Sequence, residues 1–134
     1  MRLSRLLALP LTLLFTPLFA DGPDIKEGSW HINSTTEMHG MPMGDTTMPY
    51  ESVQCLTMEN MTPAGQDSQC TISDEKITGS SINWKIQCPT GHGEGTVRYT
   101  HKTFNGVTTM WVTTPMGELE VITQMFGQYQ GPCQ

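Results

Sequence analysis

The sequence predicts an all-β fold: a single antiparallel, strongly curved sheet, or a small half-open barrel, of about seven strands with two disulfides. Three observations support this: composition, alternating side chains and turn signals. Eight of the ten leucines lie within residues 1–20, whereas residues 21–134 hold 17 threonines, seven isoleucines, five valines and one alanine. Helical bundles need Leu and Ala along their apolar stripes, and β-branched residues favour strands. The composition therefore argues against an all-α fold.

Period-2 alternation of side chains predicts the first strands. It is clearest over Trp30–Met38, and Tyr50–Leu56 predicts a second strand. Cys70–Ile77 and Ser81–Cys88 then flank a turn centred on Gly79. This turn predicts a hairpin in which opposed side chains share one face of the sheet.

The last third of the chain predicts a meander. Asn105-Gly106 is typical of a type I′ turn and would pair Tyr99 with Val112. A second turn at Met116-Gly117 would pair Val112 with Val121. Both registers place the same apolar set on one face: Val97, Tyr99, Met110, Val112, Leu119 and Val121. We expect four of these to line an apolar concavity: Tyr99, Met110, Val112 and Val121.

The first twenty residues predict a secretory signal peptide. Arg2 and Arg5 precede an apolar run, Leu6–Phe19, and Ala20 is a small residue at the expected cut. The run is about 14 residues long, whereas a membrane-spanning helix needs about 20. We therefore expect an exported, soluble, periplasmic or secreted protein, with residues 21–134 forming a single β-rich domain and no membrane span after cleavage.

The charge balance argues against nucleic acid as a partner. Without Arg2 and Arg5 the chain holds five basic and 13 acidic residues, a net charge of −8. A chain this acidic lacks the basic surface that binds phosphate backbones.

The four cysteines predict two disulfides, because an even set in a small exported domain is normally oxidised. The sequence contains no Cys-x-x-Cys motif, which argues against a zinc site. The hairpin around Gly79 would place Cys70 directly opposite Cys88, at a separation that suits a disulfide. We therefore favour Cys70 with Cys88, which leaves Cys55 to pair with Cys133.

Short motifs follow one another along the mature chain: Gly28-Ser29-Trp30, Cys55-Leu56-Thr57, Cys70-Thr71, Trp84 four residues before Cys88, Gly93-Glu94-Gly95, Phe104-Asn105-Gly106 and Gly131-Pro132-Cys133. In order and spacing this series resembles the domain of unknown function 3617 family, small exported proteins of Gram-negative bacteria. The resemblance implies a β-rich fold and a periplasmic or envelope location. It implies no activity, cofactor or catalytic residue.

A Met/Pro-rich loop predicted over residues 38–49 is the most suggestive site for chemistry. Thioether sulfurs are soft ligands that favour Cu(I) and bind without losing a proton. The candidate copper ligands are Met38, His39, Met41, Met43 and Met48. Methionine is also an adaptable apolar filler, and packing at the open end of a thin sheet is the favoured interpretation.

The sequence shows no catalytic constellation, such as His-Glu-x-x-His or a nucleophile elbow. Gly91–Gly95 is interpreted as a flexible turn, because it lacks the Lys of a phosphate-binding loop. We therefore expect a non-catalytic module that binds a partner protein or an apolar small molecule and has no cofactor. The alternative is a Cu(I)-binding or copper-buffering protein.

Overall fold

The computed structural model describes residues 23–62 and 69–134. The signal peptide predicted over residues 1–20 lies outside this range. The described residues form seven strands: β1 (Gly28–His39), β2 (Thr46–Leu56), β3 (Thr71–Thr78), β4 (Ser81–Cys88), β5 (Gly91–Thr100), β6 (Thr103–Thr114) and β7 (Gly117–Gly131). Within this part of the chain no helix is long and apolar enough to cross a membrane.

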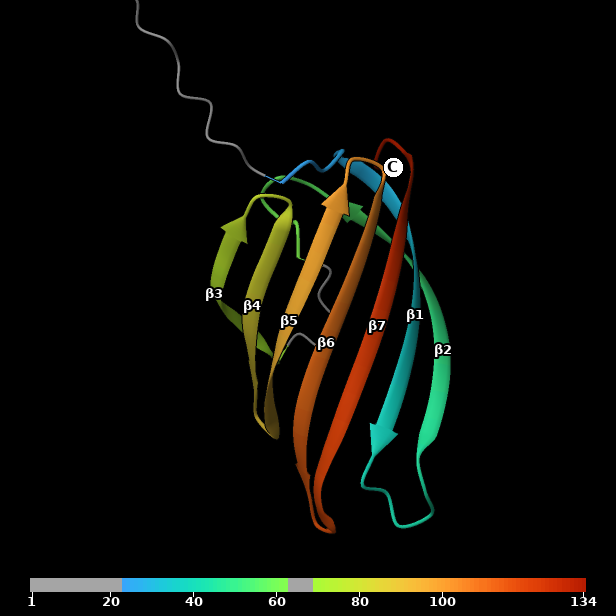
Figure 1. Cartoon of the computed structure of the whole chain (residues 1–134), viewed down its shortest axis with the longest axis vertical. Coiled ribbons are helices and arrows are strands. Elements are labelled where there is room, and N and C mark those ends of the chain that lie inside the picture. Colours follow the sequence, from blue (N-terminus) through green and yellow to red (C-terminus); the bar gives the residue numbers. More distant parts are fainter. Residues whose placement is uncertain (1–22, 63–68) are drawn as a thin grey trace, which may run out of the picture.

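All seven strands belong to one antiparallel sheet with the order β2-β1-β7-β6-β5-β4-β3 (Figure 1). The sheet is strongly curved but stays open, since β2 and β3 each have a single neighbour in that order. The all-β prediction of about seven antiparallel strands with two disulfides is therefore confirmed.

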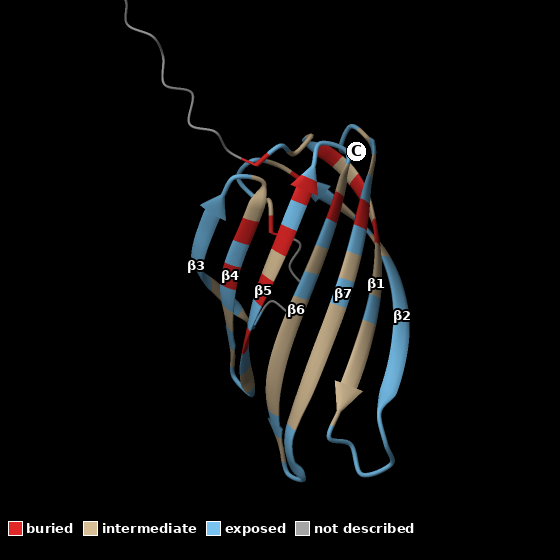
Figure 2. Cartoon of the chain, in the orientation of Figure 1, coloured by how far each residue is buried: buried red, intermediate tan, exposed pale blue. Residues whose placement is uncertain are grey.

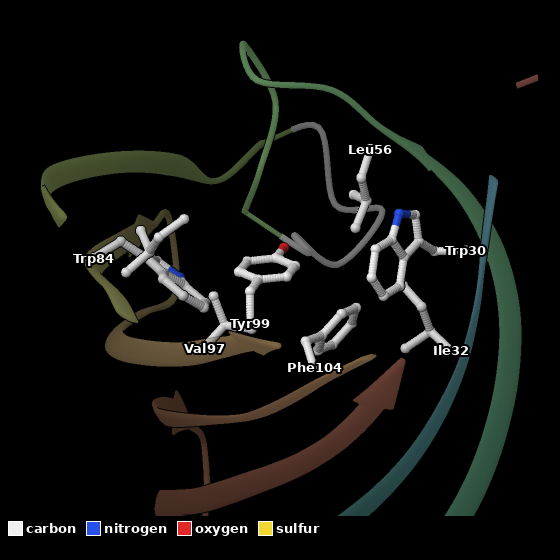
Figure 3. Close-up of a cluster of buried hydrophobic side chains, with 8 residues drawn as sticks. Trp30, Ile32, Leu56, Trp84, Val97, Tyr99 and Phe104 are labelled. Carbon is white, nitrogen blue, oxygen red and sulfur yellow. The ribbon is translucent and has the colours of Figure 1, made fainter. Parts of the chain in front are cut away.

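The hydrophobic core fills only one end of the concave face. Eight apolar side chains are buried there: Trp30, Ile32, Leu56, Ile82, Trp84, Val97, Tyr99 and Phe104. Figure 2 shows these buried positions gathered where β1 begins and β5 ends, while the other end of the sheet is half-buried or exposed. The Trp30 ring lies 6.0 Å from Tyr99 and 5.6 Å from Phe104 between centroids (Figure 3). One aromatic cluster thus anchors several strands at that end.

Glycines on the concave face let large side chains lie flat against the sheet. A Cβ at Gly127 would overlap the ring of Phe104, and a Cβ at Gly95 would overlap the indole of Trp84. The turn predicted at Gly91–Gly95 is therefore wrong: this segment begins β5. Its glycines occur where neighbouring backbone or side chains approach the strand closely, which is a known role of glycine in strands.

The hairpin between β5 and β6 turns earlier than predicted. Its turn is His101-Lys102, where His101 has a positive φ of 52°, and Asn105-Gly106 lies inside β6. Tyr99 consequently pairs with Phe104 and not with Val112. The earlier turn buries Phe104 against Trp30 and Tyr99. Core burial therefore prevails over the local turn preference of Asn-Gly.

The turn between β6 and β7 also differs from the prediction. It is formed by Pro115-Met116, so Val112 pairs with Leu119 and Met110 pairs with Val121. Both register errors are even, eight residues for the partner of Tyr99 and two for the partner of Val112. Because side chains alternate with a period of two, an even error keeps each residue on its predicted face.

The hairpin of β3 and β4 matches the predicted register beside the cysteines, where Ile72 pairs with Ile86. The register changes between Ser73 and Lys76, and Asp74 there has a φ of 52°. This bulge adds a residue, so Thr78 pairs with Ser81 across a two-residue turn.

The loop between β1 and β2 is shorter than the predicted 38–49. β1 continues to His39 and β2 begins at Thr46, which leaves residues 40–45 as the loop. The sequence predicts that the second strand begins at Tyr50, whereas β2 includes Pro49, because β2 is an edge strand, where proline is tolerated.

The connection from β2 to β3 joins opposite edges of the sheet, and a disulfide holds each of its ends. Cys55 is bonded to Cys133 and Cys70 to Cys88, with Cα separations of 5.5 and 4.2 Å. These are the two pairs that the sequence favoured. Along the described part of the connection, the Tyr99 hydroxyl donates a hydrogen bond to the Met61 carbonyl. The described part of the connection therefore packs against the end of the concave face that holds the core.

Removing the Cys55–Cys133 disulfide is expected to cost more stability than removing Cys70–Cys88, because the bridged residues are 78 positions apart in one case and 18 in the other. Loop-closure entropy gives an expected loss of unfolding free energy of about 4.5 kcal/mol for Cys55–Cys133 and about 3 kcal/mol for Cys70–Cys88. Urea denaturation of the two double serine variants measures this difference. An equal or larger loss for Cys70→Ser/Cys88→Ser would contradict the entropic argument.

Adding a methyl group at Gly127 is expected to destabilise the protein by about 1–3 kcal/mol, because the new Cβ overlaps the Phe104 ring. The matched control is the same substitution in a Phe104→Leu background, where the ring is gone. Urea denaturation of the four proteins in this cycle should give a smaller loss for Gly127→Ala in that background. Equal losses in both backgrounds would show that the ring is not the cause.

Candidate functional site

A cavity of about 600 Å³ occupies the concave face next to the aromatic core. All seven strands contribute to it, and its described lining consists of Ile32, Ser34, Thr36, Tyr50, Ser52, Gln54, Cys70, Ile72, Trp84, Ile86, Cys88, Thr90, Gly91, Thr108, Met110, Val112, Thr123 and Met125. The volume lies within the range of pockets that hold small-molecule ligands. The cavity exists because the core fills only part of the concave face.

The described lining carries no acidic, basic or histidine side chain. The basic residues of the sheet occupy the convex face. Lys85 Nζ lies 3.7 Å from Asp74 Oδ2. Arg98 lies between Val97 and Tyr99, which face the concave side, so its own side chain points to the convex side. Strand alternation thus divides the molecule into a charged convex face and an uncharged cavity.

Three threonines cross the floor of the cavity side by side. Thr36, Thr123 and Thr108 occupy directly opposed positions on β1, β7 and β6, and we call them the threonine row. The Oγ1 atoms of Thr36 and Thr123 are 2.9 Å apart and share a hydrogen bond. Ser34 and Ser52 extend this polar region towards the β2 edge.

An apolar wall faces the other side of the cavity. It consists of Ile72 from β3 and of Trp84 and Ile86 from β4. Ile72 and Ile86 are cross-strand partners, and the disulfide between Cys70 and Cys88 continues the wall beyond them. The cavity therefore offers hydroxyl groups on one side and hydrocarbon on the other.

The Trp84 indole is buried, with an exposed fraction of 2%. Its Nε1–H finds no hydrogen-bond partner among the residues that the structure describes. An unpaired buried donor costs free energy, so packing of the ring over Gly95 has to offset that cost.

The four residues predicted to line an apolar concavity share the concave face but separate along it. Met110 and Val112 line the cavity. Tyr99 is fully buried in the core, and Val121 pairs with Met110 outside the described lining. Sequence reasoning missed the threonine row, although Thr36 lies on the same side of its strand as Trp30 and Ile32 in the predicted alternation.

The five candidate copper ligands are divided between the two faces of the sheet and the loop. Met38 and His39 are consecutive in β1, so their side chains point to opposite faces. Met48 pairs with Thr36 and shares the concave face with Met38. In the loop, the Met41 sulfur accepts a weak hydrogen bond from Thr46, and Met43 is 98% exposed. In the described residues, no three His, Cys, Asp or Glu side chains are grouped to hold a metal ion.

His39 instead forms an ion pair that closes the loop. Its Nδ1 lies 2.9 Å from Asp45 Oδ2, and its Nε2 lies 3.7 Å from Glu37 Oε2. The hydrogen bond to Asp45 raises the pKa of His39 above its ordinary value of 6.5. Asp45 therefore favours the protonated imidazole.

The second depression, of about 580 Å³, lies on the convex face between β3 and β6. Charged side chains of both signs line it, including Asp74, Lys85 and Glu94. Its charges are exposed and Lys85 is already paired with Asp74, so it offers a ligand less than the uncharged cavity does.

Asp45→Asn is expected to lower the pKa of His39 towards 6.5, because the charged acceptor is lost. In the wild type, the raised folded-state pKa means that His39 stabilises the loop fully below the unfolded pKa, and that this contribution disappears as pH rises through the folded pKa. An NMR pH titration of the imidazole measures the change. An unaltered His39 titration in the variant would contradict the assignment to Asp45.

Comparison with known proteins adds one positive finding. A protein-family model described as "Protein of unknown function (DUF3617)" matches residues 25–133. A search of curated proteins and a search of solved structures found no significant match. The matched region spans all seven strands and both disulfides. The chain therefore belongs to the DUF3617 family, as its motifs suggested.

Proposed function

We propose that the protein is an exported, periplasmic module that binds an apolar small molecule in its concave cavity and catalyses no reaction. The observation that supports this most directly is the cavity of about 600 Å³, whose described lining is free of charged side chains. Such side chains supply most general acids, general bases and charged electrophiles in enzymes.

A small molecule fits this site better than a partner protein does. The cavity is concave and draws its described lining from all seven strands, whereas protein interfaces of standard size bury a broad, flatter surface. The convex face mixes charged and threonine side chains with exposed apolar ones, such as Val53, Val107 and Phe126, and its depression is lined by charges of both signs. Recognition of a ligand by enclosure is therefore the function that this arrangement supports.

Two features support the proposed location. The basic and apolar pattern of residues 1–20 is typical of an export signal. All four cysteines are paired in disulfides, and such bonds persist in oxidising compartments such as the bacterial periplasm.

Filling the cavity is expected to weaken ligand binding. Thr108→Trp places an indole in the cavity, whereas Thr109→Trp places the same group on the convex face one residue later. With the neutral fluorescent probe N-phenyl-1-naphthylamine, the dissociation constant should rise by about tenfold or more for Thr108→Trp. It should stay within about twofold of wild type for Thr109→Trp.

Circular dichroism checks that both variants fold, and Thr123→Phe with Gln124→Phe supplies a second matched pair. Failure of the wild type to bind the probe, or equal weakening by both members of a pair, would overturn the proposal. Native mass spectrometry of protein isolated from its own periplasm should show a co-purifying neutral mass and the loss of residues 1–20.

A further inference from the structure

We propose, on the basis of the proposed function, that the ligand is an uncharged amphiphile: an alkyl chain that carries a hydroxyl or ester head group, of the monoacylglycerol type. The alkyl chain contacts the apolar wall of Ile72, Trp84 and Ile86. The head group hydrogen-bonds to the threonine row. Charge, hydrogen-bonding capacity and shape each lead to this class.

The described lining of the cavity holds no charged side chain, which argues against an ionic head group on the ligand. A carboxylate or phosphate moved out of water needs a cation or several donors to offset its lost hydration. None of the chain's basic residues beyond position 22 lines the cavity. Lys85 is paired with Asp74, and the Lys26 ammonium lies over the Tyr129 ring, 4.6 Å from its centroid. A cationic head group is disfavoured for the same reason, since no acid lines the cavity among the residues that the structure describes.

The threonine row calls for a ligand that accepts or donates hydrogen bonds. Each hydroxyl carries one proton, and the bond between Thr36 and Thr123 uses one of the two. The remaining O–H group of that pair, and the O–H group of Thr108, can each donate a hydrogen bond to a carbonyl or hydroxyl oxygen of the ligand. A pure hydrocarbon would cover these groups and leave them unpaired, which is unfavourable.

The apolar wall on the opposite side of the cavity favours a ligand that carries a hydrocarbon chain. Ile72 and Ile86 are partners on adjacent strands, and Met110 and Val112 add flexible and branched hydrocarbon from β6. Burying an alkyl chain here removes apolar surface of both ligand and protein from water, which favours binding. A sugar without an alkyl chain would leave this wall in contact with water.

Competition against N-phenyl-1-naphthylamine tests the class with three ligands of one chain length: 1-monolauroylglycerol, laurate and dodecyltrimethylammonium, each below its critical micelle concentration. We expect the monoacylglycerol to displace the probe at a concentration about tenfold or more below either ion. The double variant Thr36→Val/Thr123→Val keeps the shape of the side chains and removes two hydroxyls. It should weaken monoacylglycerol binding about tenfold, a larger change than it causes in the binding of the probe, which carries no oxygen atom to accept these hydrogen bonds.

The matched control is Thr35→Val/Thr109→Val, which makes the same change on the convex face of β1 and β6 and should leave all affinities at wild-type values. Laurate or the ammonium ion binding as tightly as the monoacylglycerol would overturn this inference while leaving the proposed function standing. An unchanged affinity in the Thr36→Val/Thr123→Val variant would do the same. Failure of the wild type to bind the probe itself would overturn the proposed function.

Discussion

A single curved sheet has to bury its own concave face, and the rest of this structure depends on that constraint. No second layer covers the sheet in the described residues, so its own side chains and the β2–β3 connection do this. The aromatic cluster around Trp30 fills the concave face at one end only, because the chain has few large apolar residues. Disulfides at Cys55 and Cys70 hold the connection against both edges of the sheet. The cavity is the part of the concave face that this material does not fill.

Which face each side chain occupies was predictable, because it depends on a period of two and survives even errors of register. Met110 and Val112 were placed correctly on the concave face although the turns before and after them were misplaced. The cysteine pairs followed from one hairpin whose register held beside Cys70 and Cys88. Local patterns therefore carried the fold class and the disulfide framework.

Positions along the strands were not predictable, because tertiary packing decides them. Asn105-Gly106 is a strong turn signal, yet it lies inside β6, since only the turn at His101-Lys102 brings Phe104 into the core. The glycines of β5 locally favour a turn, but in the folded sheet Trp84 lies over Gly95 and Met110 over Gly93. The threonine row joins three strands that are far apart in sequence, so no local window contained it. The cavity likewise exists only once the sheet curves.

The division of chemistry between core and cavity links stability to binding. At the end of the concave face that holds the core, aromatic rings lie against glycines, and this close packing tolerates few substitutions. Beyond them the concave face carries threonine, serine and methionine, whose side chains tolerate either water or a ligand. Because the disulfides and the aromatic end hold the sheet in shape, the remaining surface need not be optimised for packing. A thin core with two disulfides can therefore keep an open, uncharged cavity that a fully packed sheet of this length would lack.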